Sequence, residues 1–177
     1  MRRRDFIRYL GLGSVAVTIP EAMHAVPAAA TTLCSDKKTK PISGSWFEFQ
    51  HSAAEGGYWN EALAHFTADQ WRRKVFEIRE VGMEYLVLMG VARAGKPFYP
   101  SKIAPRIPMG CDDPLEAVLS AADECGIKFF VSNDFWGDLD AYNMMLDKGV
   151  QTVRFQAMEE IAERYSHHAC FYGWYFP

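Results

Sequence analysis

Residues 127–133 read IKFFVSN, a short run of aliphatic and aromatic residues that ends in two polar ones. Three similar runs lie at residues 42–49, 85–92 and 170–176, and successive runs start 43, 42 and 43 residues apart. Short apolar runs of this kind are typical of buried strands, and each interval is long enough to hold a helix. The regular spacing therefore predicts repeated βα units and a parallel sheet.

The intervals carry the start and stop signals of helices. Residues 67–82 open with the capping-box sequence TADQ and end in glycine. Residues 113–126 open with DPLE, in which Glu116 is expected to complete a second capping box, and also end in glycine. A third helical region is expected between residues 138 and 167, broken near Gly149.

An open doubly wound sheet and a closed eight-fold barrel both begin with such units. The constant repeat length, the absence of a glycine-rich phosphate turn after residues 42–49, and the long polar and aromatic segments after each strand favour the barrel. The expected fold class is therefore α/β, of the (β/α)₈ TIM-barrel type. Eight such units need about 340 residues, so we expect residues 42–177 to be the N-terminal half of the barrel, with only about the first four βα units present.

The N-terminus reads as an export signal. Residues 3–8 are RRDFIR, a twin-arginine motif, followed by a short apolar stretch over residues 9–19 and three alanines at residues 28–30. The apolar stretch is shorter than the roughly 20 residues that cross a bilayer, so stable membrane insertion is not expected. We predict a signal peptide over residues 1–30, recognised by the twin-arginine translocase, a linker over residues 31–41, and a periplasmic or secreted protein.

The composition indicates one folded domain. Of 177 residues 49% are hydrophobic, and the net charge is −3, made up of +2 in the first 30 residues and −5 in the rest. An acidic mature chain is unfavourable for nucleic-acid binding. The four cysteines lie too far apart for a C-x-x-C metal motif, so free thiols are expected, with a disulfide as the alternative and with no metal or cofactor.

Functional residues in such a barrel lie at the carboxyl ends of the strands and in the loops that follow. Alternation along residues 42–49 places Trp46 and Glu48 toward the barrel interior and the two phenylalanines toward the helices. Residues 132–136 combine hydrogen-bonding side chains with a flat apolar ring, as a sugar requires. The predicted substrate-binding residues share this polar or aromatic character and are Trp46, Glu48, His51, Trp59, Tyr99, Asn133, Asp134, Trp136 and Trp174.

Other roles are open for the same residues. Glu48 could instead be a structural carboxylate paired to a base, and the aromatic residues could close the barrel mouth as core. His167 and His168 follow the last helical pattern and are expected to be surface residues that favour the helix dipole.

Four motifs, in order along the chain, resemble the domain of unknown function 4434 family: ISGSWFEF at 42–49, GMEYLVL at 82–88, GIKFF at 126–130 and FYGWYFP at 171–177. The resemblance covers about residues 42–177 and implies an exported, glycoside-hydrolase-like barrel without a firmly assigned reaction. In retaining barrel glycosidases the acid/base glutamate follows strand four, often after an asparagine. The closing run is similar to the approach to that pair, which would lie beyond Pro177, so no catalytic residue is carried over.

Three functions remain open. In the first, the complete protein hydrolyses a glycosidic bond of a carbohydrate or glycoside ligand, and residues 42–177 are inactive alone. In the second, it is a non-catalytic carbohydrate-binding barrel. In the third, it is a metal-dependent sugar isomerase-type barrel. The last needs Glu, Asp and His ligands on later strands, and Glu48 with Asp134 is not sufficient.

Overall fold

The computed structural model describes residues 41–50, 61–134, 136–137 and 146–176, which belong to a compact unit that begins at Pro41. The predicted signal peptide and most of the predicted linker lie outside the described residues, as do His51 and Trp59.

Four strands form one sheet in which every neighbouring pair is parallel. The order across the sheet is the order along the chain, as repeated right-handed crossovers produce. This confirms the predicted α/β class with a parallel sheet. In sheet order, the strands are β1 (Gly44–Phe47), β2 (Tyr85–Leu88), β5 (Lys128–Ser132) and β6 (Phe171–Tyr175).

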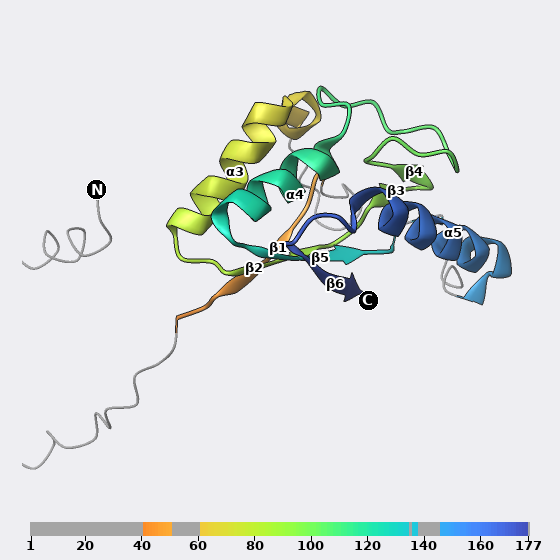
Figure 1. Cartoon of the computed structure of the whole chain (residues 1–177). Coiled ribbons are helices and arrows are strands. Elements are labelled where there is room, and N and C mark those ends of the chain that lie inside the picture. Colours follow the sequence, from red (N-terminus) through yellow and green to blue (C-terminus); the bar gives the residue numbers. More distant parts are fainter. Residues whose placement is uncertain (1–40, 51–60, 135, 138–145, 177) are drawn as a thin grey trace, which may run out of the picture. The chain divides into compact units, whose positions relative to one another are not determined.

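Helices α3 (Ala68–Glu80) and α4 (Pro114–Cys125) lie side by side over one face of this sheet (Figure 1). Arg72 joins the two helices, because its guanidinium donates to Ser120 Oγ and to Glu124 Oε1, both at 2.6 Å. The core between the helices and the sheet is made of buried apolar side chains that include Trp71, Val75, Leu86, Val118, Leu119 and Phe129.

The helix ends lie close to their predicted positions. At α3, Thr67 Oγ1 accepts from Gln70 N and Gln70 Oε1 accepts from Thr67 N, which confirms the capping box. At α4, Asp113 accepts from Glu116 N at 3.0 Å, and the helix ends at a left-handed Gly126 with φ +71°. The expectation for the Glu116 side chain is wrong, because its carboxylate pairs with His168 instead.

The third long helix is α5 (Lys148–Tyr165). The Asp147 side chain accepts from Val150 N at 2.9 Å and caps the helix. α5 begins one residue before Gly149, where the break is predicted, and residues 138–145 of the predicted helical region lie outside the described residues. Ala157 and Ile161 are fully buried, as the apolar periodicity predicts.

The two faces of β1 have different environments. The rings of Phe47 and Phe49 pack 6.0 and 5.2 Å from the ring of Trp71 on α3, whereas Trp46 is 54% exposed on the opposite face. This confirms the predicted alternation. Trp46 also contacts Tyr175 of β6, with ring centroids 4.9 Å apart.

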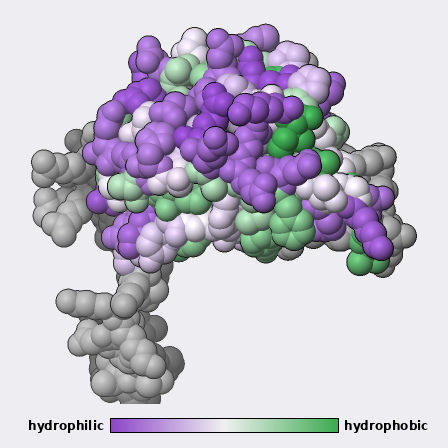
Figure 2. Space-filling model, turned by 45° about the vertical axis from the view of Figure 1, so that its right-hand side comes forward, coloured by the Kyte–Doolittle hydropathy of each residue, from purple (hydrophilic) through white to green (hydrophobic). Residues whose placement is uncertain are grey.

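That aromatic contact shows how the sheet is shaped. Strands β1 and β6 are its two edges, and three strand spacings on a flat sheet amount to about 14 Å. Two side chains that meet across this width indicate a sheet that is concave on the face opposite the helices. In Figure 2 hydrophilic residues dominate the upper part of the face in view, and apolar residues gather along the lower edge, at the level where Figure 1 places the sheet.

A short antiparallel pair, β3 (Ala92–Arg93) and β4 (Lys96–Pro97), follows β2. Its turn contains Ala94 and Gly95, both with positive φ. Within the described part of the chain, no helix has the length and apolar character needed to cross a membrane.

Candidate functional site

The carboxyl ends of the four parallel strands meet at one edge of the sheet, and the candidate site is built from the residues that follow them. After β1, Glu48 is half-buried and follows Trp46 on the concave face by alternation. Gln50 accepts a hydrogen bond of 3.2 Å from Arg93 of β3. The segments after β1 and β2 are thereby joined, which holds two strand ends in register.

The polar side chains at the end of β5 are unusual because they are fully buried. Ser132 and Asn133 are both 0% exposed. Among the described residues, neither Ser132 Oγ nor the two amide atoms of Asn133 has a hydrogen-bond partner. A buried polar group without a partner costs about 1–3 kcal/mol, and such groups are rare in native proteins unless they have a function.

Asp134 and Trp136 are buried beside these groups along the chain, each 6% exposed. Trp136 packs against the β3–β4 turn, since a Cβ on Gly95 would lie 3.1 Å from Trp136 O. The indole nitrogen Nε1 of Trp136 also has no hydrogen-bond partner in the described part of the chain. Ser132 at the end of β5 and the segment after it therefore contain a hydroxyl, an amide and an indole N–H that are buried and that no described residue hydrogen-bonds.

Two predicted residues lie elsewhere. Tyr99 is fully buried; its hydroxyl donates to Glu160 Oε2 at 3.0 Å, and its ring packs on Tyr165. Burial, followed by the charge of Glu160, raises the pKa of Tyr99 well above its ordinary value, so the phenol stays neutral and attaches the segment after β4 to α5. Trp174 packs with Phe171 against the helix-covered core, on the convex side of the sheet.

Five of the predicted residues lie on or after strands of the parallel sheet. Glu48 follows β1, and Trp46 lies on the concave face of the same strand. Asn133, Asp134 and Trp136 follow β5, which β2 separates from β1. His51 and Trp59 belong to the part of the chain that the structure does not describe.

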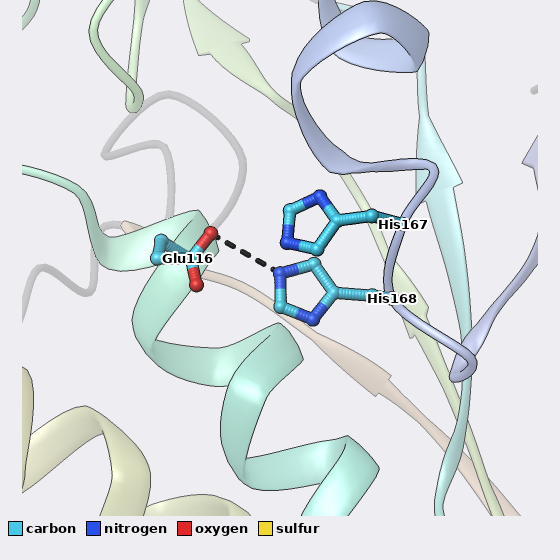
Figure 3. Close-up of side chains that lie close together, drawn as sticks. All are labelled: Glu116, His167 and His168. Carbon is cyan, nitrogen blue, oxygen red and sulfur yellow. Dashed lines mark hydrogen bonds and ion pairs between the residues drawn. The ribbon is translucent and has the colours of Figure 1, made fainter.

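A second group of polar residues was missed by sequence reasoning. His168 is 6% exposed, and its Nδ1 lies 2.7 Å from Asp123 Oδ2. Its Nε2 lies 3.1 Å from Glu116 Oε2 (Figure 3). The expectation of a surface position holds for His167 and is wrong for His168. The signal was the spacing of Glu116 and Asp123, two turns apart on α4 and so on one helix face.

The hydrogen bonds within this group shift the pKa values of His168 and Asp123 in the directions that favour their charged forms. Burial by itself lowers the pKa of His168, but the hydrogen bonds to Asp123 and Glu116 outweigh it, and the pKa lies above its ordinary 6.5. Burial raises the pKa of Asp123, but hydrogen bonds from His168 and the Cys170 backbone outweigh it, and the pKa lies below 3.8. The two carboxylates on either side of His168 therefore favour its imidazolium form.

A hollow of about 210 Å³ lies at the opposite, amino end of β2 and β5. Lys128 lies at this end, with Nζ 4.5 Å from the ring centroid of Tyr172 and 5.4 Å from that of Tyr85. Its lining is mostly polar and consists of Arg79, Glu84, Tyr85, Gly126 and Lys128. Ligands of parallel α/β sheets bind at the carboxyl ends of the strands, so this hollow is the weaker candidate.

The chain belongs to the family described as Domain of unknown function (DUF4434), whose model matches residues 42–177. The predicted family is thereby confirmed. No curated protein matches this sequence significantly.

Solved structures show the same fold. A crystal structure described as a "putative alpha-L-fucosidase" from Bacteroides thetaiotaomicron VPI-5482 superposes with a TM-score of 0.55 at 14% identity, over 88% of this chain and 47% of that chain. An alpha-L-fucosidase GH29 from Bacteroides thetaiotaomicron gives a TM-score of 0.45 at 17% identity, over 76% of this chain and 38% of that one. The chain thus spans about half the length of the first of these proteins, and that likeness shows an α/β fold.

Proposed function

We propose that this chain is the N-terminal half of a (β/α)₈ barrel that binds carbohydrate at the carboxyl end of its sheet, and that the complete protein hydrolyses glycosidic bonds. The observation that carries the proposal is the fully buried Asn133, whose amide atoms have no partner at the end of β5. An uncompensated amide at this end of a parallel sheet is explained if a hydroxyl-rich ligand completes its hydrogen bonds.

The barrel is supported by three independent features. Successive strands begin at a nearly constant interval, as in a barrel of repeated units. The contact between Trp46 and Tyr175 indicates a sheet that curves toward the face opposite the helices. The superposition on the fucosidase-like protein covers 88% of this chain but 47% of the larger one.

The concave face supports a carbohydrate ligand. Trp46 is about half exposed on it, and Tyr175 lies against Trp46. Flat aromatic rings bind the C–H faces of sugars, while Ser132 and Asn133 offer hydrogen bonds to hydroxyls at the strand ends. Such a mixture of apolar surface and a few placed polar groups is typical of small-molecule sites.

Hydrolysis adds a requirement for two carboxylates that flank the scissile bond, one to protonate the leaving oxygen and one to attack the sugar or activate water. Glu48 and Asp134 are the carboxylates that follow β1 and β5. We assign neither a catalytic role, because the acid/base of barrel glycosidases is expected after the fourth strand. The described residues that could hold a metal lie between α4 and the start of β6, so a metal-dependent isomerase has no support at the strand ends of the described chain.

The proposal is tested on the full-length protein by calorimetric titration with oligosaccharides and by an aryl-glycoside panel that includes α-L-fucoside. Trp46→Ala should weaken oligosaccharide binding about tenfold or more, as loss of an exposed stacking ring does at a binding site. Phe155→Ala is the matched control, because Phe155 is a similarly exposed ring on α5. Equal losses in both variants, or none in Trp46→Ala, would refute the site. Binding without turnover would leave the non-catalytic carbohydrate-binding function.

We also propose that the protein is exported through the twin-arginine pathway, on the basis of the RRDFIR motif at residues 3–8. Replacing Arg3 and Arg4 by lysine should retain the precursor inside the cell, measured by fractionation and immunoblotting. Continued export of the double variant through the general secretory route would disprove this assignment.

A further inference from the structure

We propose that Glu116, His167 and His168 form a binding site for a divalent transition-metal ion, with zinc as the ligand that fits best. The three ligand atoms, a carboxylate oxygen and one imidazole nitrogen from each histidine, all lie within 4.8 Å of one another. Figure 3 shows the carboxylate of Glu116, from α4, facing the two histidine rings, which come from the segment before β6. Two histidines and a glutamate are a donor set that zinc takes in proteins, with the fourth position left to water.

The distances are close to those that a metal ion requires. Zinc bonds of about 2.0–2.2 Å place the ligand atoms of a tetrahedral site about 3.4 Å apart. Glu116 Oε2 and His168 Nε2 are 3.1 Å apart, and the rings of His167 and His168 stack with centroids 4.2 Å apart. The Glu116 side chain is 45% exposed and His167 is exposed, so both can rotate to complete the site while His168 stays fixed.

His168 is held in the orientation that metal binding needs. Its Nδ1 lies 2.7 Å from Asp123 Oδ2, and the other oxygen of Asp123 accepts from Cys170 N at 2.6 Å. Metal-binding histidines commonly donate their second ring nitrogen to a carboxylate, which fixes the tautomer and leaves the other nitrogen for the ion. Asp123 is therefore the positioning residue of the site.

A second set of ligand atoms, from Asp123, His168 and Cys170, overlaps the first. It is less suitable, because Cys170 Sγ donates to Leu119 O at 3.2 Å and both oxygens of Asp123 already accept hydrogen bonds. An ion in the first set replaces only the interaction between Glu116 and His168.

The ion would join the first turn of α4 to the segment before β6, which are far apart in the sequence. In its absence the two hydrogen bonds of His168 to Asp123 and Glu116 make this connection. The charged and titratable groups that face His168 are Glu116 and Asp123 from α4, and His167 and Cys170 from its own segment.

The test uses the full-length, tag-free protein, stripped with a chelator and titrated with zinc by calorimetry and thermal unfolding. We expect one ion per chain and a Tm rise of about 5–10 °C at a free zinc concentration 100 times the Kd. His167→Ala should weaken zinc binding at least tenfold and remove most of the Tm rise. The metal-free Tm should change little, because His167 is exposed.

His65→Ala is the matched control, an exposed histidine at the end of a different helix, and should bind zinc as the parent does. Asp123→Asn should weaken binding about 10–100-fold while the visible spectrum of the cobalt-substituted protein keeps its form. A parent without a zinc-dependent Tm rise, or His167→Ala that binds like the parent, would overturn the proposal. A thiolate-to-cobalt charge-transfer band would also overturn it, because that band assigns the ion to Cys170.

Discussion

Replacing Asn133 by leucine should stabilise the fold while it weakens ligand binding. Asn133 is 0% exposed, and neither Oδ1 nor Nδ2 has a hydrogen-bond partner. Its backbone carbonyl accepts from Arg154 Nε at 3.0 Å, and this bond survives the substitution because only the side chain changes. Leucine has nearly the same shape as asparagine, so the change removes the polar atoms without leaving a cavity.

The magnitude follows from the two amide atoms. Each buried donor or acceptor without a partner costs about 1–3 kcal/mol, so the two atoms cost about 2–6 kcal/mol together, and strain from the bulkier methyl groups of leucine costs about 1–3 kcal/mol. The net gain in the free energy of unfolding should therefore be about 1–3 kcal/mol. For a domain of this size each kcal/mol raises Tm by about 2–4 °C.

Urea unfolding of the full-length protein measures this gain directly, as a higher midpoint at an unchanged m-value. Gln156→Leu is the matched control, because it makes an equivalent amide-to-leucine change at an exposed position on α5 and should stay within about 0.5 kcal/mol of the parent. A loss of more than 1 kcal/mol in Asn133→Leu would show that the amide stabilises the folded state, and the argument for a ligand at this strand end would fail.

Three further predictions concern the rest of the described chain. The pKa of His168 is raised above 6.5 in the folded state, so the stabilisation from its protonated form is complete below pH 6.5 and is lost as pH rises through the folded pKa. In metal-free protein the free energy of unfolding should therefore fall over this pH range. His168→Gln should remove this pH dependence. Glu160→Ala should cost about 2–3 kcal/mol, since Glu160 accepts from Tyr99, Ser101 and the backbone of Lys102, whereas the exposed neighbour in Glu159→Ala should change stability by less than about 0.5 kcal/mol in the same urea titration. Gly110→Ala should cost about 1–3 kcal/mol, because its Cβ would lie 2.6 Å from a backbone oxygen of His65; a thermal midpoint equal to the parent's would contradict this.

The strands and the helix caps could be predicted because their signals are local. The runs at residues 42–49, 85–92, 127–133 and 170–176 contain all four strands of the parallel sheet. The capping box at Thr67 depends on atoms three residues apart, so the sequence contains all of its parts. Such features are set by backbone geometry within one turn.

The wrong predictions concern side chains that hydrogen-bond to a residue far away in the sequence. Glu116 has the right spacing for a capping box, but His168, 52 residues later, takes its carboxylate. Tyr99 has the character of a ligand-binding residue, but its hydroxyl donates a hydrogen bond to Glu160 of α5, and its side chain is fully buried.

The sequence by itself determined the family, the α/β class and the order of strands and helices. Periodicity, helix caps and strand motifs each depend on residues that are close together in the sequence. Only the tertiary structure decided which polar groups remain without partners after folding, such as Asn133, and which distant residues meet, such as Glu116 and His168. Hydrogen bonding and burial depend on every element that packs around a side chain. Pairings between residues far apart in the chain therefore appear only when the sheet and its helices are assembled.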